Sequence, residues 1–265
     1  MGVHNGERWL REAVDSVLGQ TLADLELIVI DDGSTDGTAD VLRDIGQESG
    51  DRRLSVLRHS RVGLTISLNR GFRLARAPFL ARLDADDVAE PERLARQLAF
   101  LEAHPEVGVL GTACLLVDEA GRALGAYHPP ESDAAIRRAL IRENPIVHSS
   151  VMMRRTAFEA AGCYDESLAV AQDYDLWLRA SRVTAMANLP DPLVKRRLAG
   201  DRVSLVRDRE RLRAEVAVKL RALRAGAYPA WCAVFLVKPL LGLALPGGAR
   251  RLLRAAAGRI TQAPR

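Results

Sequence analysis

Cysteine is scarce in this sequence. Its 265 residues include three cysteines, Cys114, Cys163 and Cys232, which are scattered, odd in number and in no CxxC pair. A disulfide framework and a cysteine zinc site are therefore disfavoured, and the cysteine usage fits a reducing compartment.

Long hydrophobic runs are also absent. The sequence contains no stretch of about 18 uncharged apolar residues, which excludes a simple transmembrane helix. The first residues, which include His4, Asn5, Glu7 and Arg8, are polar and unlike a signal peptide. We therefore expect a cytoplasmic protein that is at most peripheral on the inner face of the cytoplasmic membrane.

The charge of the chain is unevenly distributed. The formal net charge is +4, but residues 201–265 hold 14 Lys and Arg against 4 Asp and Glu, whereas the first 200 residues hold 24 against 30. An acidic body suits a cation-binding site, and a basic tail suits an anionic partner surface. The composition, with 48% hydrophobic and 27% charged residues, is that of a soluble globular protein.

Short apolar runs alternate with helical patterns in the first half of the chain. The predicted strands cover residues 25–30, 54–57, 79–83 and 107–117. The predicted helices cover residues 6–20, with Asn5 as candidate N-cap, a segment ending near residue 47, residues 64–75, and a segment that opens at Pro91. This alternation predicts an α/β fold with a mainly parallel sheet flanked by helices.

Two acidic clusters directly follow predicted strands. Asp31 and Asp32 follow the strand 25–30, and Asp84-Ala85-Asp86-Asp87 follows the strand 79–83. Ligands of such sheets bind at the carboxyl ends of strands, although either cluster alone is also consistent with an Asp-rich turn. In the DxD spacing of Asp84 and Asp86, both carboxylates can face one cation. Mg²⁺ or Mn²⁺ is the expected cofactor, because these hard ions prefer carboxylate and phosphate oxygens.

Several motifs follow one another along about residues 3–198. These motifs are Asn5-Gly6-Glu7 through Gln20-Thr21, Asp31-Asp32-Gly33-Ser34-Thr35-Asp36, Gly63-Leu64 with Leu68-Asn69-Arg70-Gly71, Asp84-Ala85-Asp86-Asp87 with Pro91-Glu92-Arg93-Leu94, Asn144-Pro145-Ile146-Val147-His148-Ser149-Ser150-Val151, and Gln172-Asp173-Tyr174-Asp175-Leu176-Trp177-Leu178-Arg179. In these motifs, and in their order and spacing, the sequence resembles family 2 glycosyltransferases of the GT-A fold.

The resemblance implies a role for five aspartates. Asp32 would hydrogen-bond the nucleotide base, and Asp31 would support the same loop. Asp84 would contact the ribose or the metal shell, and Asp86 would coordinate the metal that bridges the two phosphates of a nucleotide-diphosphate sugar. Asp173 would be the general base that deprotonates the acceptor hydroxyl.

The chain departs from the family pattern at two positions. Gln172 stands where the family usually has Glu, which removes one negative charge beside Asp173. Ser149 follows His148 where the family usually has proline, which leaves the local loop geometry open. Asp173 also has a structural alternative, as the N-cap of the helix that follows it.

Three further residues are candidates for acceptor or loop contacts, namely His148, Asp175 and Trp177. His148 is equally consistent with a buried histidine whose hydrogen bonds are satisfied. Trp177 is also consistent with a side chain that packs its helix against the core.

The implied activity is that of an inverting glycosyltransferase. It would move a sugar from a nucleotide-diphosphate donor to a hydroxyl of a glycan or lipid-linked acceptor, in the synthesis of bacterial surface polysaccharide. One alternative is a nucleotidyltransferase, but no Gly-rich phosphate loop with Arg or Lys follows the first strand. Another is a non-catalytic nucleotide- or glycan-binding module, which the joint presence of Asp32, Asp86 and Asp173 disfavours. No nucleic-acid partner is expected.

We expect two parts in the chain. Residues 1–200 would form the GT-A domain, and residues 201–265 would form a basic and apolar helical C-terminal extension. The first strand of the domain looks truncated, since Met1 to Asn5 corresponds to the end of the strand with which family members usually begin. We expect the natural chain to carry about 5–6 further residues and a short lead at its front. The alternative is a genuinely shortened protein.

The extension is predicted to contain a basic helix over residues 203–225 and a nearly apolar segment from Trp231 to Leu245. Fifteen helical residues rise about 22 Å, less than the roughly 30 Å hydrocarbon core, and Lys238-Pro239 interrupts the run. A segment with Trp231 at one end and arginines on both flanks suits the interface of an anionic membrane. The alternative is a helix that packs on the catalytic domain or on a second subunit.

Overall fold

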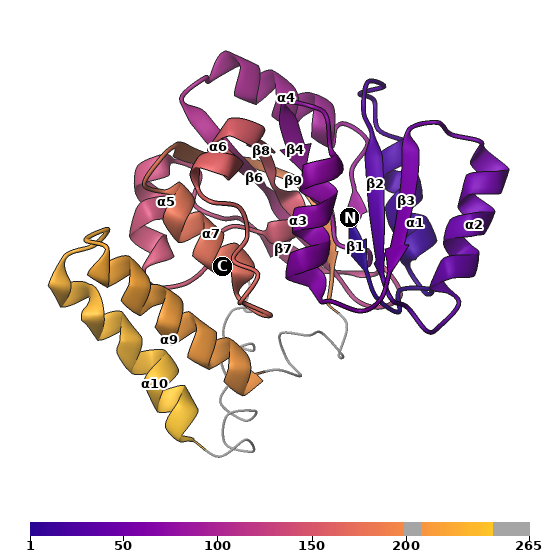
Figure 1. Cartoon of the computed structure of the whole chain (residues 1–265). Helices are drawn as coiled ribbons and strands as arrows, with labels where there is room; N and C mark the ends of the chain where they lie inside the picture. The colour runs from indigo at the N-terminus through magenta and orange to yellow at the C-terminus, as the bar shows by residue number, and fades with distance from the viewer. Residues whose placement is uncertain (199–207, 246–265) are drawn as a thin grey trace. The chain divides into compact units, whose positions relative to one another are not determined.

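The computed structural model describes residues 1–198 and 208–245 (Figure 1). The chain forms two compact units, Met1–Ala199 and Gly200–Arg265. The boundary between them falls beside the point at which the sequence changes from acidic to basic. Each unit is described by itself below.

The first part of unit one is a parallel sheet with strand order β1-β2-β3. Its strands are β1 (Gly2–Val3), β2 (Leu27–Asp32) and β3 (Leu54–His59), and its helices are α1 (Leu10–Leu18), α2 (Thr38–Ser49) and α3 (Leu64–Leu74). The alternation of strands and helices predicted from the sequence is confirmed here. Because β2 and β3 are parallel, Asp32 pairs with His59 and both strands end at the same edge of the sheet.

The core of this part forms where apolar helix faces meet the sheet. Leu10 and Val14 of α1 lie four residues apart and are both fully buried, together with Val29 of β2 and Ile45 of α2. This spacing places one side of each helix against the strands. The packing fixes the position of the loop that follows β2.

The first helix begins at Leu10 rather than at residue 6. Asn5 has a φ of 54°, so it does not cap the helix, and its side-chain oxygen instead accepts a hydrogen bond from the Thr35 amide at 2.9 Å. The helix begins after Trp9, with no side-chain cap. The prediction of Asn5 as N-cap is therefore wrong, because Asn5 holds the loop after β2.

A second, mixed sheet of six strands completes unit one. It comprises β4 (Phe79–Ala81), β8 (Met152–Arg154), β6 (Val107–Val117), β9 (Ala185–Arg197) and β5 (Val88–Ala89) in that order, with β7 (Ala123–Tyr127) paired to β6. Its helices are α4 (Arg93–Ala103), α5 (Asp133–Leu140), η1 (His148–Ser150), α6 (Arg155–Ala160) and α7 (Gln172–Ala180).

The expectation of a mainly parallel sheet holds only for the first sheet. In the second sheet β6 and β9 are parallel, whereas β4–β8, β6–β8, β5–β9 and β6–β7 are antiparallel. The connection between β6 and β7 is too short for a crossover helix, and a short connection can only return the chain antiparallel. The α/β class is confirmed, and the parallel arrangement is corrected to a parallel sheet beside a mixed one.

Unit two is a helical hairpin within the residues that the structure describes. It contains α9 (Asp208–Arg224), the 3₁₀ helix η2 (Ala230–Leu236) and α10 (Val237–Ala244). Leu212 and Val218 of α9, together with Cys232 and Leu236 of η2, are buried. The apolar segment is thus split into two short helices, and Pro239 lies in the first turn of α10, where the missing N–H has no helical partner.

Several residues of the predicted extension lie outside the described part, namely 203–207 at the start of the basic helix and Arg250, Arg251, Arg254 and Arg259. No helix within residues 1–198 and 208–245 has the length and apolar character needed to cross a membrane. The expectation about additional residues before Met1 stays a prediction.

Candidate active site

The loop after β2 is organised by Asp32, which is 4% exposed. Its Oδ1 accepts a hydrogen bond from the Val62 amide at 2.7 Å, and its Oδ2 accepts one from the Gly63 amide at 2.9 Å. Gly63 has a φ of 101°, a conformation that favours glycine. Asp32 therefore joins the end of β2 to the start of α3, at the edge where the nucleotide is expected.

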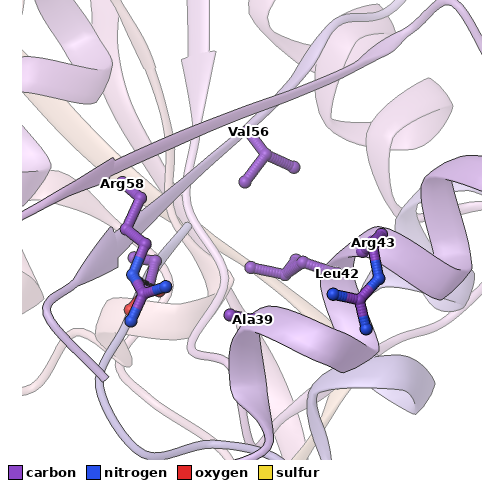
Figure 2. A pocket seen from close by; sticks show the side chains of 6 residues that line it. Ala39, Leu42, Arg43, Val56 and Arg58 are labelled. Carbon is purple, nitrogen blue, oxygen red and sulfur yellow. Dashed lines mark ion pairs between the residues drawn. The ribbon is translucent and has the colours of Figure 1, made fainter. Parts of the chain in front are cut away.

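Asp31 points to the other face of β2. Its Oδ1 accepts a hydrogen bond from the Ser34 amide at 2.9 Å, and its Oδ2 lies 3.2 Å from the Arg58 Nε. On this face a cavity of about 200 Å³ is lined by Asp31, Ala39, Leu42, Arg43, Val56 and Arg58. Figure 2 shows Arg58 and Arg43 on its two sides, with Leu42 and Val56 between them. Asp31 thus contacts its own loop, as expected of a supporting residue.

Three aspartates lie together after β4. Carboxylate oxygens of Asp84, Asp86 and Asp87, here called the aspartate cluster, all lie within 4.8 Å of one another. Burial and the charges of Asp84 and Asp87 raise the pKa of Asp86 to about 7. Burial and the charge of Asp84 raise the pKa of Asp87 to about 6. Raised carboxyl pKa values show that the cluster is short of positive charge.

The donor set of the cluster fits a divalent cation. It offers only carboxylate oxygens, which Mg²⁺ and Mn²⁺ prefer, and its excess negative charge would be neutralised by such an ion. The sequence analysis assigned Asp86 to the metal and did not assign Asp87. The third consecutive acidic position was the available signal for Asp87.

Arg82 is the internal counter-ion of the cluster, and its side chain is 2% exposed. It binds both carboxylate oxygens of Asp84, with one contact at 2.5 Å, and it donates to the Ser149 hydroxyl at 3.1 Å. Burial alone would raise the pKa of Asp84, but the charge and hydrogen bonds of Arg82, together with the Ser149 hydrogen bond and the influence of His148, hold the pKa well below its ordinary value. Asp84 is therefore ionised and paired, whereas no ion pair to Asp86 or Asp87 is recorded in the described part of the chain.

Ser149 is a second residue, besides Arg82, that bonds to Asp84. Its hydroxyl donates to Asp84 Oδ2 at 2.8 Å, while the Asp84 amide donates to the hydroxyl at 3.2 Å. Ser149 is the residue that replaces the family's usual proline, and a proline has no hydroxyl to make these bonds. Ser149, which departs from the family pattern, therefore contacts Asp84, the first aspartate of the DxD motif.

Asp173 lies in the first turn of α7 and is held by Asn144. The Asn144 Nδ2 donates to Asp173 Oδ2 at 2.8 Å, and the Asn144 Oδ1 accepts from the Ile146 amide at 3.2 Å, which fixes the orientation of the side-chain amide. Burial raises the pKa of Asp173. The residue before the helix is Ala171, with a φ of 59° and no side-chain cap, so the alternative of Asp173 as N-cap is wrong.

His148 lies between the aspartate cluster and α7. Its Nε2 is 2.6 Å from the Tyr164 hydroxyl, and its ring meets the Trp177 ring edge-on at 6.0 Å between centroids. Burial and the charge of Arg82 lower the pKa of His148 well below its ordinary value, so the ring is neutral at pH 7. The ring is thus hydrogen-bonded in a buried setting, which is the structural alternative considered for it.

The other two acceptor candidates lie in the interior. Asp175 is 1% exposed, and its carboxylate pairs with Arg179 at 2.8 Å. Trp177 is fully buried among the helices and the sheet. Asp175 is thus held by an ion pair within α7, and the burial of Trp177 is that of a packing residue, the alternative raised for it.

Besides Asp87 and Ser149, four further residues of the site were not identified from the sequence: Arg82, Asn144, Tyr164 and Arg196. Arg82 had a visible signal, because a charged residue inside the apolar run from Phe79 to Leu83 requires a buried partner. Asn144 belongs to a quoted motif but had no assigned role. The others depend on contacts between segments far apart in the chain.

Comparisons with known proteins point to one family. The family model described as "Glycosyl transferase family 2" matches residues 1–162. A Bacillus subtilis protein named "Putative glycosyltransferase EpsE" is 35% identical over 68% of this chain and 64% of its own length. The amylovoran biosynthesis glycosyltransferase AmsE of Erwinia amylovora is 31% identical over 78% of this chain and 77% of its own length.

A solved structure supports the fold. The mannosyltransferase PcManGT from Pyrobaculum calidifontis, in complex with GDP-Man and Mn²⁺, superimposes with a TM-score of 0.64 at 21% identity, over 97% of this chain and 78% of that one. This likeness confirms the GT-A type of α/β fold. The chain spans just under two thirds of the length of the Bacillus relative.

Proposed function

Because the chain belongs to glycosyltransferase family 2, we propose that it transfers a sugar from a nucleotide-diphosphate donor to a hydroxyl of an acceptor, with inversion at the anomeric carbon. The observation that carries the proposal is the arrangement of two kinds of acid around Arg82. Arg82 pairs with Asp84 of the aspartate cluster, and the Arg82 charge also acts on Asp173. A cation site and a base are thus close together in one unit.

The donor is assigned to the end of β2 and to the aspartate cluster. Asp32 would contact the nucleotide base, with Asp31 supporting its loop. Asp84, which is held by Arg82 and Ser149, would accept a hydrogen bond from the ribose. Asp86 and Asp87 would hold the divalent cation, Mg²⁺ or Mn²⁺. When bound, that cation stabilises the negative charge that develops on the leaving diphosphate.

The acceptor is assigned to Asp173. The acceptor oxygen forms a bond to the anomeric carbon while the bond from that carbon to the diphosphate oxygen breaks, and its electron pair leaves with the diphosphate. The hydroxyl proton passes to Asp173, a step that contributes roughly 10²–10⁴-fold to the rate. Asn144 holds the carboxylate in place through one hydrogen bond, and within residues 1–198 and 208–245 no ion pair to Asp173 is recorded.

The acceptor class is a glycan or a lipid-linked sugar in bacterial surface polysaccharide synthesis. The name of the Erwinia relative refers to amylovoran biosynthesis, and this relationship supports the proposed class. The alternative of a nucleotidyltransferase would require a nucleoside triphosphate as substrate. The alternative of a binding module would show donor binding without turnover.

The proposal is tested by a donor screen with Mn²⁺. We expect purified protein to hydrolyse one nucleotide-diphosphate sugar slowly in the presence of Mn²⁺ and to be inert with EDTA. Uridine- and guanosine-diphosphate sugars are the first probes. Release of pyrophosphate from a nucleoside triphosphate and a sugar phosphate would favour the nucleotidyltransferase. Donor binding without hydrolysis or transfer with any acceptor would favour the binding module.

We further propose that unit two binds an anionic membrane surface. Five large apolar side chains along η2 and α10 are 48–66% exposed, namely Trp231, Val234, Val237, Leu240 and the adjacent Leu241, and the first four recur every three residues. Exposed basic side chains accompany them, namely Arg209, Arg213, Arg224 and Lys238. An apolar face flanked by basic residues suits the boundary between headgroups and acyl chains, and each basic residue adds about 1 kcal/mol.

Vesicle co-sedimentation tests this surface. We expect the full chain to bind phosphatidylglycerol vesicles more than phosphatidylcholine vesicles at low salt, and we expect the double variant Trp231→Ser/Leu241→Ser to lose that binding. Val183→Ser is the matched control, because Val183 is 51% exposed in unit one. Equal binding to both vesicle types, unchanged in the double variant, would instead favour packing of the helices on protein.

A further inference from the structure

Arg196 stands out among the basic residues of β9. Its neighbours on the strand have partners: Lys195 pairs with Glu90 at 3.2 Å, and Arg197 pairs with Glu12 at 2.7 Å. Arg196 is half-buried, and the structure records no hydrogen bond or ion pair between its side chain and any other residue in 1–198 or 208–245. Arg196 is therefore a half-buried guanidinium whose N–H donors are available to a ligand.

The strand places Arg196 beside the aspartate cluster. The Arg197 amide donates to Asp87 Oδ1 at 2.8 Å, so the backbone next to Arg196 is bonded directly to the cluster. Side chains alternate along a strand, so Arg196 points to the opposite face of β9 from Lys195 and Arg197.

The charge of Arg196 acts on both sides of the site. Burial raises the pKa of Asp87 and of Asp173, and the Arg196 charge opposes the rise at each of them. Burial lowers the pKa of His148, and Arg196 adds to that fall. One guanidinium is thus within electrostatic reach of the cluster, of the base and of the histidine between them.

We propose that Arg196 binds a phosphate group of the substrate, between the aspartate cluster and Asp173. This inference rests on the proposed glycosyl transfer, which leaves a diphosphate with increasing negative charge. The planar guanidinium offers parallel N–H donors that match phosphate oxygens. The phosphate has two sources, the diphosphate of the donor or a phosphate of a lipid-linked acceptor, and both would bring an anion to the unpaired donors of Arg196.

Calorimetry distinguishes the two sources. In the first arm, uridine diphosphate and guanosine diphosphate are titrated with Mn²⁺ into the wild type and into Arg196→Met, with uridine and guanosine as probes that lack phosphate. In the second arm, geranyl phosphate is titrated in the presence of a saturating nucleoside diphosphate. If the donor is the source, we expect Arg196→Met to weaken the nucleoside diphosphate at least tenfold and to leave the nucleoside unchanged. If the acceptor is the source, we expect the same loss for geranyl phosphate alone.

Two further variants serve as controls for Arg196→Met. Lys195→Met removes a charge from the neighbouring position and is expected to bind all probes as the wild type does. Arg196→Lys keeps the positive charge but lacks the parallel N–H donors of the guanidinium, and we expect it to restore part of the affinity. Each variant is compared at equal folded fraction, measured by circular dichroism.

Two results would be negative, and they differ in meaning. If the wild type binds diphosphate and Arg196→Met binds both diphosphate and geranyl phosphate equally well, the role of Arg196 is overturned while the proposed function stands. If the wild type binds no nucleoside diphosphate with Mn²⁺, the proposed function fails and the role of Arg196 fails with it.

Discussion

The aspartate cluster and Asp173 are both acidic, yet their surroundings differ. The cluster brings three carboxylates within 4.8 Å and provides one buried counter-ion, Arg82, which is used by Asp84. Asp173 is a single carboxylate whose direct side-chain partner is the neutral amide of Asn144. Burial raises the pKa of Asp86 and of Asp173 alike, but only Asp86 has further carboxylates as neighbours.

This difference separates a cation site from a proton acceptor. Crowded carboxylates without enough counter-charge gain from a divalent cation, because the cation removes their repulsion. A general base needs the opposite environment, since a close cation would lower its pKa and weaken its basicity. A neutral hydrogen-bond donor fixes the base and leaves it able to accept a proton.

The largest expected effect is that of Asp173→Asn on transfer. The amide cannot accept the acceptor proton, so we expect kcat to fall roughly 10²–10⁴-fold. Donor KM should stay within about twofold, because a residue that acts only on the acceptor proton leaves donor binding intact. Initial rates at varied donor concentration measure both values. A large rise in donor KM with little change in kcat would show that Asp173 belongs to the donor side.

The next largest effect is expected for the buried ion pair between Arg82 and Asp84. Arg82→Met leaves Asp84 as a buried carboxylate without a counter-ion, and we expect a loss of about 3–5 kcal/mol in the free energy of unfolding, measured with urea. Arg11→Met is the control, because its ion pair with Glu48 is exposed and is worth about 0–1 kcal/mol. Similar losses in the two variants would contradict the role given to Arg82.

A smaller effect on stability is expected for the hydrogen bond from Ser149 to Asp84. Ser149→Ala removes the hydroxyl that contacts Arg82 and Asp84, and we expect it to lower the free energy of unfolding by about 1–3 kcal/mol. Ser167→Ala removes an exposed hydroxyl that also bonds an aspartate, and it should change stability little. Urea titrations of both variants test whether the buried hydrogen bond of Ser149 contributes more to the free energy of unfolding than the exposed one of Ser167.

The smallest effect is a shift in pH dependence. The Asn144 hydrogen bond opposes the rise that burial causes in the pKa of Asp173, so Asn144→Ala should raise that pKa further. A base acts only when deprotonated, and activity is therefore lost as pH falls through its pKa. We expect the acid limb of the kcat/KM profile to move to higher pH in the variant. Asn188→Ala, which loses a bond to Pro130 instead, should leave the limb in place.

Local sequence patterns predicted the parallel part of the fold. Apolar strands followed by turn residues located β2 and the start of the aspartate cluster, and both acidic groups lie at strand ends as expected. The second sheet was harder to predict, because strand direction there depends on which segments pair. β8 and β4, for example, are antiparallel partners separated by about seventy residues of chain.

The contacts that define the site were beyond local patterns. Ser149 meets Asp84 across 65 positions, and Asn144 meets Asp173 across 29. A sequence shows the residue types, but the pairing depends on the packing of η1 against β6 and β9 and of α7 against α5 and α6. Arg196 had no signal at all, since its neighbours Lys195 and Arg197 are equally basic.

The separation of donor and acceptor roles is tested most directly by nucleotide binding to two variants. Isothermal titration of a nucleoside diphosphate with Mn²⁺ is compared among the wild type, Asp86→Ala and Asp173→Asn. We expect Asp86→Ala to lose the Mn²⁺-dependent binding and Asp173→Asn to bind as the wild type does. Equal loss of affinity in both variants would contradict the account, because it would place both carboxylates in one function.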